Sequence, residues 1–141
     1  MTDLPCSRLL TWLQREYGDD LRVLLHYEES EYEWLYRRDD VRAQYDERSF
    51  DESVDTYREI EPLVREQSDI LDGGALRATV NVYDDIVLLQ FPMRPGEGVV
   101  VSLEATAGAD LVEIVATGLQ LLLADADAAQ ARMPDWVKQT D

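Results

Sequence analysis

The spacing of apolar residues predicts two helices, one near each end of the chain. Apolar residues recur on one helical stripe between Asp3 and Gly18, and Pro5, just after Asp3, favours a helix start there. Gly18 is typical of a helix end. Between Asp110 and Leu123, apolar residues nearly encircle the helix. This second helix is therefore expected in the core of the protein.

A further helix is predicted in the middle of the chain, after a polar connection over residues 39–48. Ser49 and Glu52 have the spacing of a capping box, in which the serine accepts a hydrogen bond from a backbone N–H and the glutamate bonds back to the N–H of the serine. Apolar residues then follow at helical spacing. Pro62 lacks a backbone donor and clashes one turn back, so we expect a kink or break near Glu59.

Alternating apolar and polar residues predict three strands, and two apolar runs later in the chain predict a fourth and a fifth. The first two strands are expected to form a hairpin, the third and fourth are joined by a tight turn at Asp84 and Asp85, and a loop over residues 92–98 precedes the fifth. The expected strands cover residues 21–27, 32–36, 76–82, 86–91 and 99–103.

The order of these elements predicts the fold class. Helix, two strands, helix, three strands and helix (αββαβββα) favour an α+β protein with a single five-stranded, mainly antiparallel sheet flanked by three helices. The chain has 141 residues, which is enough for one domain that buries its core without a metal or a disulfide. We expect the domain to cover residues 1–131 and a short C-terminal tail to cover residues 132–141.

The charge of the chain is strongly acidic, with a formal net value of -17. Twelve of the thirteen basic residues are arginine and only Lys138 is lysine. Such a surface is expected in concentrated salt, where screening reduces repulsion between carboxylates that keep the protein hydrated. This interpretation is favoured over an ordinary acidic protein or a mimic of nucleic acid. Direct binding of nucleic acid is not expected, because phosphate contacts need clustered basic residues.

The cellular location and the redox chemistry are bounded by what the sequence contains. The N-terminus lacks the pattern of a signal peptide, and no stretch reaches the roughly 20 apolar residues of a membrane span, so we expect a cytoplasmic protein without a membrane partner. The single cysteine, Cys6, excludes an intramolecular disulfide and a multi-cysteine metal site.

Candidate catalytic residues are few. His26 is the only histidine, so a multi-histidine metal site is excluded and a structural or surface role is favoured. The glutamates of the first hairpin could bind a hard cation, but alternation divides them between two faces. Asp84 and Asp85 fit the turn better than a catalytic pair. The glycine pairs lack the lysine of a phosphate loop. We therefore expect no catalytic residue, no cofactor and no metal ligand.

A partner surface is more strongly indicated. Tyr32, Trp34 and Tyr36 form an aromatic row on one face of the second strand, which packs under a helix or, if exposed, binds a partner. The third strand carries few charges: before the turn, only Arg77 has a charged side chain that would discourage pairing. The strand is therefore a candidate edge for pairing with a second copy. The possible partner surface comprises Tyr32, Trp34, Tyr36, Arg77, Thr79 and Asn81.

Two resemblances add to this interpretation. The segments 34–41, 79–85 and 89–92 (WLYRRDDV, TVNVYDD and LQFP) resemble a family of small uncharacterised proteins of halophilic archaea. The order of elements, the Asp-Asp turn, the Pro/Gly loop and the last helix resemble the Roadblock/LC7 fold, with a profilin-like fold as the alternative. The Roadblock/LC7 resemblance implies a dimeric scaffold, and it is a resemblance of topology without a diagnostic motif.

Three functional hypotheses follow. The leading one is a non-enzymatic interaction or regulatory module that forms a homodimer and binds an unidentified protein partner. The second is a small-molecule-sensing domain in which Trp34 and Tyr36 line a pocket. The third is an enzyme that uses carboxylates with a divalent cation.

Overall fold

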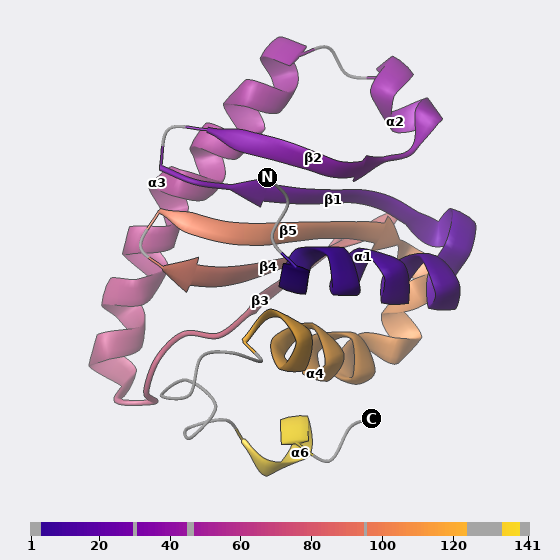
Figure 1. The fold of residues 1–141 in the computed structure, drawn as a ribbon. Coiled ribbons are helices and arrows are strands. Elements are labelled where there is room, and N and C mark those ends of the chain that lie inside the picture. The colour runs from indigo at the N-terminus through magenta and orange to yellow at the C-terminus, as the bar shows by residue number, and fades with distance from the viewer. Residues whose placement is uncertain (1–3, 30, 45–46, 95, 124–133, 139–141) are drawn as a thin grey trace.

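The fold is an α+β arrangement built on one open, five-stranded antiparallel sheet (Figure 1). A computed structural model describes residues 4–29, 31–44, 47–94, 96–123 and 134–138. The strands are β1 (Leu21–Tyr27), β2 (Tyr32–Arg37), β3 (Thr79–Val82), β4 (Ile86–Arg94) and β5 (Glu97–Glu104). Their order in the sheet is β2-β1-β5-β4-β3, so β2 and β3 are the two edges. The predicted fold class is confirmed.

Helices cover both faces of this sheet. The helices are α1 (Leu4–Tyr17), α2 (Asp39–Gln44), α3 (Glu47–Leu71), α4 (Leu111–Leu122) and α6 (Asp135–Lys138), with short 3-10 turns at Gly18–Asp20 and Ala105–Asp110. Figure 1 shows α1 and α4 on one face and α3 on the other. The two faces therefore enclose two separate apolar cores.

The larger core lies between the sheet and α1, α4 and α6. It joins Leu9 and Leu13 of α1, Phe91 of β4 and Ile114 of α4, all essentially inaccessible to solvent. Cys6 is buried in the same core, as expected for a small apolar residue. The smaller core lies beneath α2 and α3 and comprises Val23, Leu25, Tyr27, Val41, Val54 and Val100.

Segment Ala105–Leu122 is long and apolar enough to cross a membrane by length and composition alone. The core helix of a soluble protein passes the same test, and in α4 Ile114, Ala116 and Leu119 are buried in the protein core. The segment is thus weak evidence for a membrane span.

The middle of the chain differs from the sequence prediction in three ways. The expected polar connection contains α2, whose Val41 is buried in the smaller core. The helix starts before Ser49, which lies inside α3 and is not its N-cap. Pro62 also lies inside α3, which continues to Leu71. Proline in a helix interior removes one hydrogen bond and clashes one turn back, at a total cost of about 3 kcal/mol. Contacts on the N-terminal side of Pro62 can offset this cost.

The strands around the second hairpin also differ from the prediction. Of the residues expected in the loop 92–98, residues 92–94 and 97–98 belong to strands, because β4 continues to Arg94 and β5 begins at Glu97. A register shift between Pro92 and Arg94 accommodates the proline, which cannot donate to the ladder. β3 is shorter than expected and starts at Thr79. The tight turn is confirmed, since the Tyr83 N–H donates to the Ile86 carbonyl at 2.9 Å.

The segment predicted as a tail contains α6, which packs on the domain. Val137 is buried in the larger core, and the side-chain amide of Gln120 on α4 donates to the Val137 carbonyl. This contact fixes α6 against α4, at the bottom of the view in Figure 1.

Candidate interaction surface

The free edge of the sheet at β3 exposes apolar side chains. Val82 is 69 % exposed, and Val80 and Tyr83 are also exposed. No residue of β3 is charged, because the strand reads Thr-Val-Asn-Val. Of the residues predicted as a partner surface here, Arg77 and Thr79 are partly buried and Asn81 is exposed. β3 therefore lacks the charged side chains that usually discourage pairing at an edge.

The other edge of the sheet, β2, is better protected. All six of its residues are partly buried, and its sequence carries Glu33 and Arg37. The phenolic hydroxyl of Tyr32 donates to the carboxylate of Asp51 on α3, which ties β2 to that helix. The Arg37 guanidinium lies 4.6 Å from the centroid of the Trp34 ring. This edge is therefore partly covered by side chains of its own strand and of α3.

The predicted aromatic row does not lie on one face. Tyr32 and Trp34 pack against the smaller core in an edge-to-face arrangement, with centroids 5.8 Å apart. Tyr36 packs against the larger core on the opposite face, as does Leu35. The pairing shifts between Leu24 and Leu25, so that one residue of β2 is added there and the alternation is reversed beyond it.

The C-terminal half of α3 carries a second exposed apolar surface. Ile60, Leu63, Ile70 and Leu71 are exposed and recur at helical spacing; Leu63 is 65 % and Ile70 is 81 % exposed. We call these four residues the α3 stripe. In Figure 1 the C-terminal end of α3 reaches past the strands on the side of β4 and β3. The end of the helix that carries Ile70 and Leu71 thus lies on the side of the free sheet edge.

Two side chains hold α3 at the end of the sheet where the β1–β2 and β4–β5 turns lie. The Arg58 guanidinium donates to the backbone carbonyls of Glu28, at 2.8 Å, and Glu31, at 2.7 Å, next to the turn from β1 to β2. Glu61 is only 3 % exposed, and its carboxylate accepts a hydrogen bond at 3.3 Å from the N–H of Gly96, in the turn between β4 and β5. These contacts lie just before Pro62 and explain how α3 stays in place across the proline.

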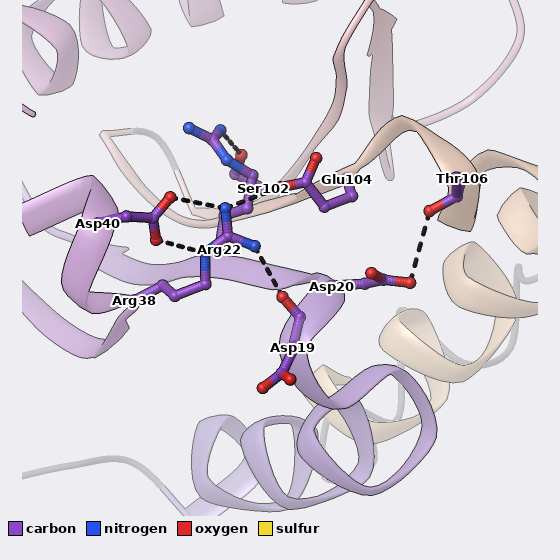
Figure 2. Close-up of polar contacts among 8 residues, drawn as sticks. All are labelled: Asp19, Asp20, Arg22, Arg38, Asp40, Ser102, Glu104 and Thr106. Atoms are coloured by element: carbon purple, nitrogen blue, oxygen red, sulfur yellow. Dashed lines mark hydrogen bonds and ion pairs between the residues drawn. The ribbon is translucent and has the colours of Figure 1, made fainter.

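A polar network at the opposite end of the sheet surrounds Arg38 (Figure 2). Arg38 donates to both carboxylate oxygens of Asp40, at 2.5 and 2.9 Å, to Glu104 at 2.7 Å and to the Asp19 carbonyl at 2.7 Å. The hydrogen bonds that Arg38 donates to Asp40 and then to Glu104 raise the pKa of Arg38 above its ordinary value. The same contact with Arg38 lowers the pKa of Asp40.

The cavity beside this network has a volume of about 600 Å³ and mixed charge. Its charged lining consists of two arginines, Arg22 and Arg38, and four acidic residues. Arg38 already bonds through all three of its nitrogens, and Arg22 donates to the Ser102 hydroxyl at 2.8 Å. Because carboxylates outnumber guanidinium groups, the cavity does not favour a phosphate or carboxylate ligand. The network thus joins β1, β2 and β5 and has a structural role.

The remaining sequence candidates have structural positions. His26 is 9 % exposed and its Nε2 lies 2.9 Å from a carboxylate oxygen of Glu97. Asp84 and Asp85 are exposed in the turn between β3 and β4. Sequence reasoning did not single out Glu97, Arg58, Glu61 or the α3 stripe. Only the stripe has a local signal, since its apolar residues recur at helical spacing among many charged residues of α3.

Comparison with known proteins gives a family without an assigned activity. A family model described as a domain of unknown function, DUF7522, matches residues 7–123. The matched region contains the whole sheet together with α3 and α4. Neither a curated protein nor a solved structure is significantly similar to the chain. The role of these surfaces is therefore argued from their residues.

Proposed function

The chain belongs to the DUF7522 family, and we propose that it is a non-enzymatic interaction or regulatory module of a salt-rich cytoplasm that works as a homodimer and binds a further protein partner. A halophilic origin and the likeness to Roadblock/LC7 proteins are part of this proposal. The observation that carries it is the uncharged, exposed edge strand β3.

The hydrogen-bonding groups of β3 can be assigned to its two sides. The Tyr83 N–H donates to Ile86, so Tyr83 directs its backbone groups toward β4. In an antiparallel ladder this direction alternates, so Asn81 and Thr79, which lie opposite Leu88 and Gln90, also bond to β4. The backbone N–H and C=O groups of Val80 and Val82 then point toward the free edge, where a second strand can bond to them.

A two-fold axis beside Asn81 would satisfy these groups. Antiparallel pairing of two β3 strands places Val80 of one protomer opposite Val82 of the other. Both valines lie on the same face of the strand, where cross-strand pairs of β-branched residues stabilise a sheet by about 0.2–1 kcal/mol each. The two exposed valines would thereby become neighbours in a continuous ten-stranded sheet.

The α3 stripe supports the same arrangement. The C-terminal end of α3 lies on the side of the free edge (Figure 1), so a two-fold axis that pairs the β3 strands would also bring the α3 helices of both protomers toward one another. Burial of apolar surface contributes roughly 25 cal/mol per Å². The stripe would therefore add the apolar area that four backbone hydrogen bonds alone do not supply.

The charge of the protein makes this association dependent on salt. Two copies of net charge -17 repel one another at low ionic strength, whereas the pairing strand itself carries no charge. The Debye length falls from about 30 Å at 0.01 M to about 3 Å at 1 M salt. We therefore expect the dimer to strengthen as KCl is added.

Light scattering coupled to size exclusion tests the proposal in multimolar KCl. The wild-type mass should be that of two chains, and Val80→Pro should give a monomer, because proline removes the outward N–H without breaking a bond to β4. Val80→Ala is the matched control and should remain dimeric or weaken only slightly. Circular dichroism establishes that each variant is folded.

Two results would contradict the proposal. The first is a wild-type mass of one chain at high protein concentration and high salt. The second is a folded Val80→Pro variant that stays dimeric, which would move the interface away from β3. Leu63→Asp then tests the stripe independently, since an interface through α3 alone would respond to this charge and not to the proline.

A further inference from the structure

Three ligand-bearing side chains meet where β1 ends and β5 begins. His26 lies in β1, Glu28 follows the same strand, and Glu97 starts β5. One ligand atom of each lies within 4.8 Å of those of the other two. The strands are neighbours in the sheet, with His26 opposite Val99 and Tyr27 opposite Gly98. The pairing of β1 with β5 therefore brings Glu97 close to His26 and Glu28.

The distance between His26 and Glu97 suits a hydrogen-bonded ion pair and is also compatible with two ligands of one metal ion. The His26 Nε2 and a Glu97 oxygen are 2.9 Å apart, a separation that two ligands can have when each is bonded to one ion at about 2.0–2.2 Å. Glu28 is exposed, so its side chain can rotate to supply the third ligand and leaves the site open to solvent.

The charges of the cluster favour a cation. Two carboxylates meet one imidazole, so these three side chains together are negative. The Arg94 guanidinium lies 3.8 Å from a Glu97 oxygen, but its side chain is 82 % exposed and leaves the Glu28 carboxylate unneutralised. A plain ion pair between His26 and Glu97 would leave the Glu28 carboxylate next to another carboxylate. A divalent ion would neutralise both, and an imidazole nitrogen distinguishes this site from the many exposed acidic groups of the surface.

We propose that His26, Glu28 and Glu97 bind one divalent first-row metal ion that accepts imidazole, such as Zn2+ or Co2+, as a link between β1 and β5. Mg2+ and Ca2+ should bind this site more weakly, because they prefer oxygen ligands and one ligand here is an imidazole nitrogen. The ion would join two neighbouring inner strands, at the end of β1 and the start of β5. Binding to the folded state alone then raises stability with ion concentration.

Titration with Co2+ tests this site, because Co2+ substitutes for Zn2+ and absorbs visible light in a ligand-dependent way. In about 1 M KCl, where screening weakens binding to surface carboxylates, the wild-type protein should bind one Co2+ per chain. Isothermal titration with Zn2+ should give the same stoichiometry. His26→Gln, Glu28→Gln and Glu97→Gln should each weaken binding by at least about tenfold.

Glu29→Gln is the matched control, since Glu29 is the exposed neighbour of Glu28 and lies outside the cluster. It should bind Co2+ as the wild type does, and excess Mg2+ should not displace the ion. The proposal is overturned if Glu28→Gln and Glu29→Gln lose affinity equally, or if Co2+ binding does not saturate near one ion. Because Glu28 is exposed, its variant stays decisive even if His26→Gln fails to fold.

Discussion

Replacing Gly118 by alanine sets two opposing free-energy terms against each other within α4. Alanine is favoured over glycine in a helix by about 1 kcal/mol. However, a Cβ atom at Gly118 would lie 2.7 Å from Cζ and 3.0 Å from Cε1 of Phe91. Ordinary contacts between carbon atoms are about 3.5–4.0 Å, so α4 and β4 must separate or the buried ring must move.

Packing should decide the sign of this substitution. Phe91 is only 2 % exposed, and overpacking of such a core costs about 1–3 kcal/mol, at the upper end where the obstacle is a whole ring. After the helix propensity is subtracted, we expect a net loss of about 1–2 kcal/mol in the free energy of unfolding. The melting temperature should fall by roughly 3–8 °C for a chain of this size.

Chemical denaturation followed by circular dichroism measures this loss. Gly108→Ala is the control, because its Cβ would meet Val87 at an ordinary 3.5 Å, and its stability should hardly change. In a Phe91→Leu background, Gly118→Ala should no longer destabilise the protein, and the difference measures the coupling of the two positions. A Gly118→Ala variant at least as stable as the wild type would refute the reasoning, since the gain in helix propensity would then offset the whole cost of overpacking.

Three further predictions concern charge. Arg58→Ala should lower the free energy of unfolding by about 1–3 kcal/mol in urea denaturation, because two backbone carbonyls lose a charged donor, whereas Arg15→Ala on an exposed side chain should have no effect. Burial, followed by nearby carboxylates, raises the pKa of Tyr17 above 10.0, so wild-type stability should fall as pH rises beyond that value; in Tyr17→Phe this part of the alkaline loss should be absent. The melting temperature should be higher in about 1 M than in about 0.01 M KCl, and equal values would contradict the inference of a salt-adapted surface.

The elements that the sequence predicts well are those with a buried face. Apolar spacing identifies α1 and α4, because both bury residues in the larger core, while alternation identifies β1, β2 and β3 and apolar runs identify β4 and β5. α2 escapes prediction because a single buried residue, Val41, ties it to the core. Of the kink or break predicted at Pro62, the break does not occur, for a related reason: the contacts of Arg58 and Glu61 that hold α3 in place reach backbone atoms, which leave no pattern in the sequence.

The candidate sites show where alternation along a strand stops being informative. Alternation divides the hairpin glutamates between two faces, but it cannot identify the partner of His26. That partner is Glu97, 71 residues away on β5. Only the register between β1 and β5 brings these residues together, and register depends on the whole sheet. The extra residue in β2 acts in the same way on Tyr36, which moves to the face opposite Trp34. A bulge has no reliable compositional signal, so the face of a side chain can be predicted from alternation only as far as the first register shift.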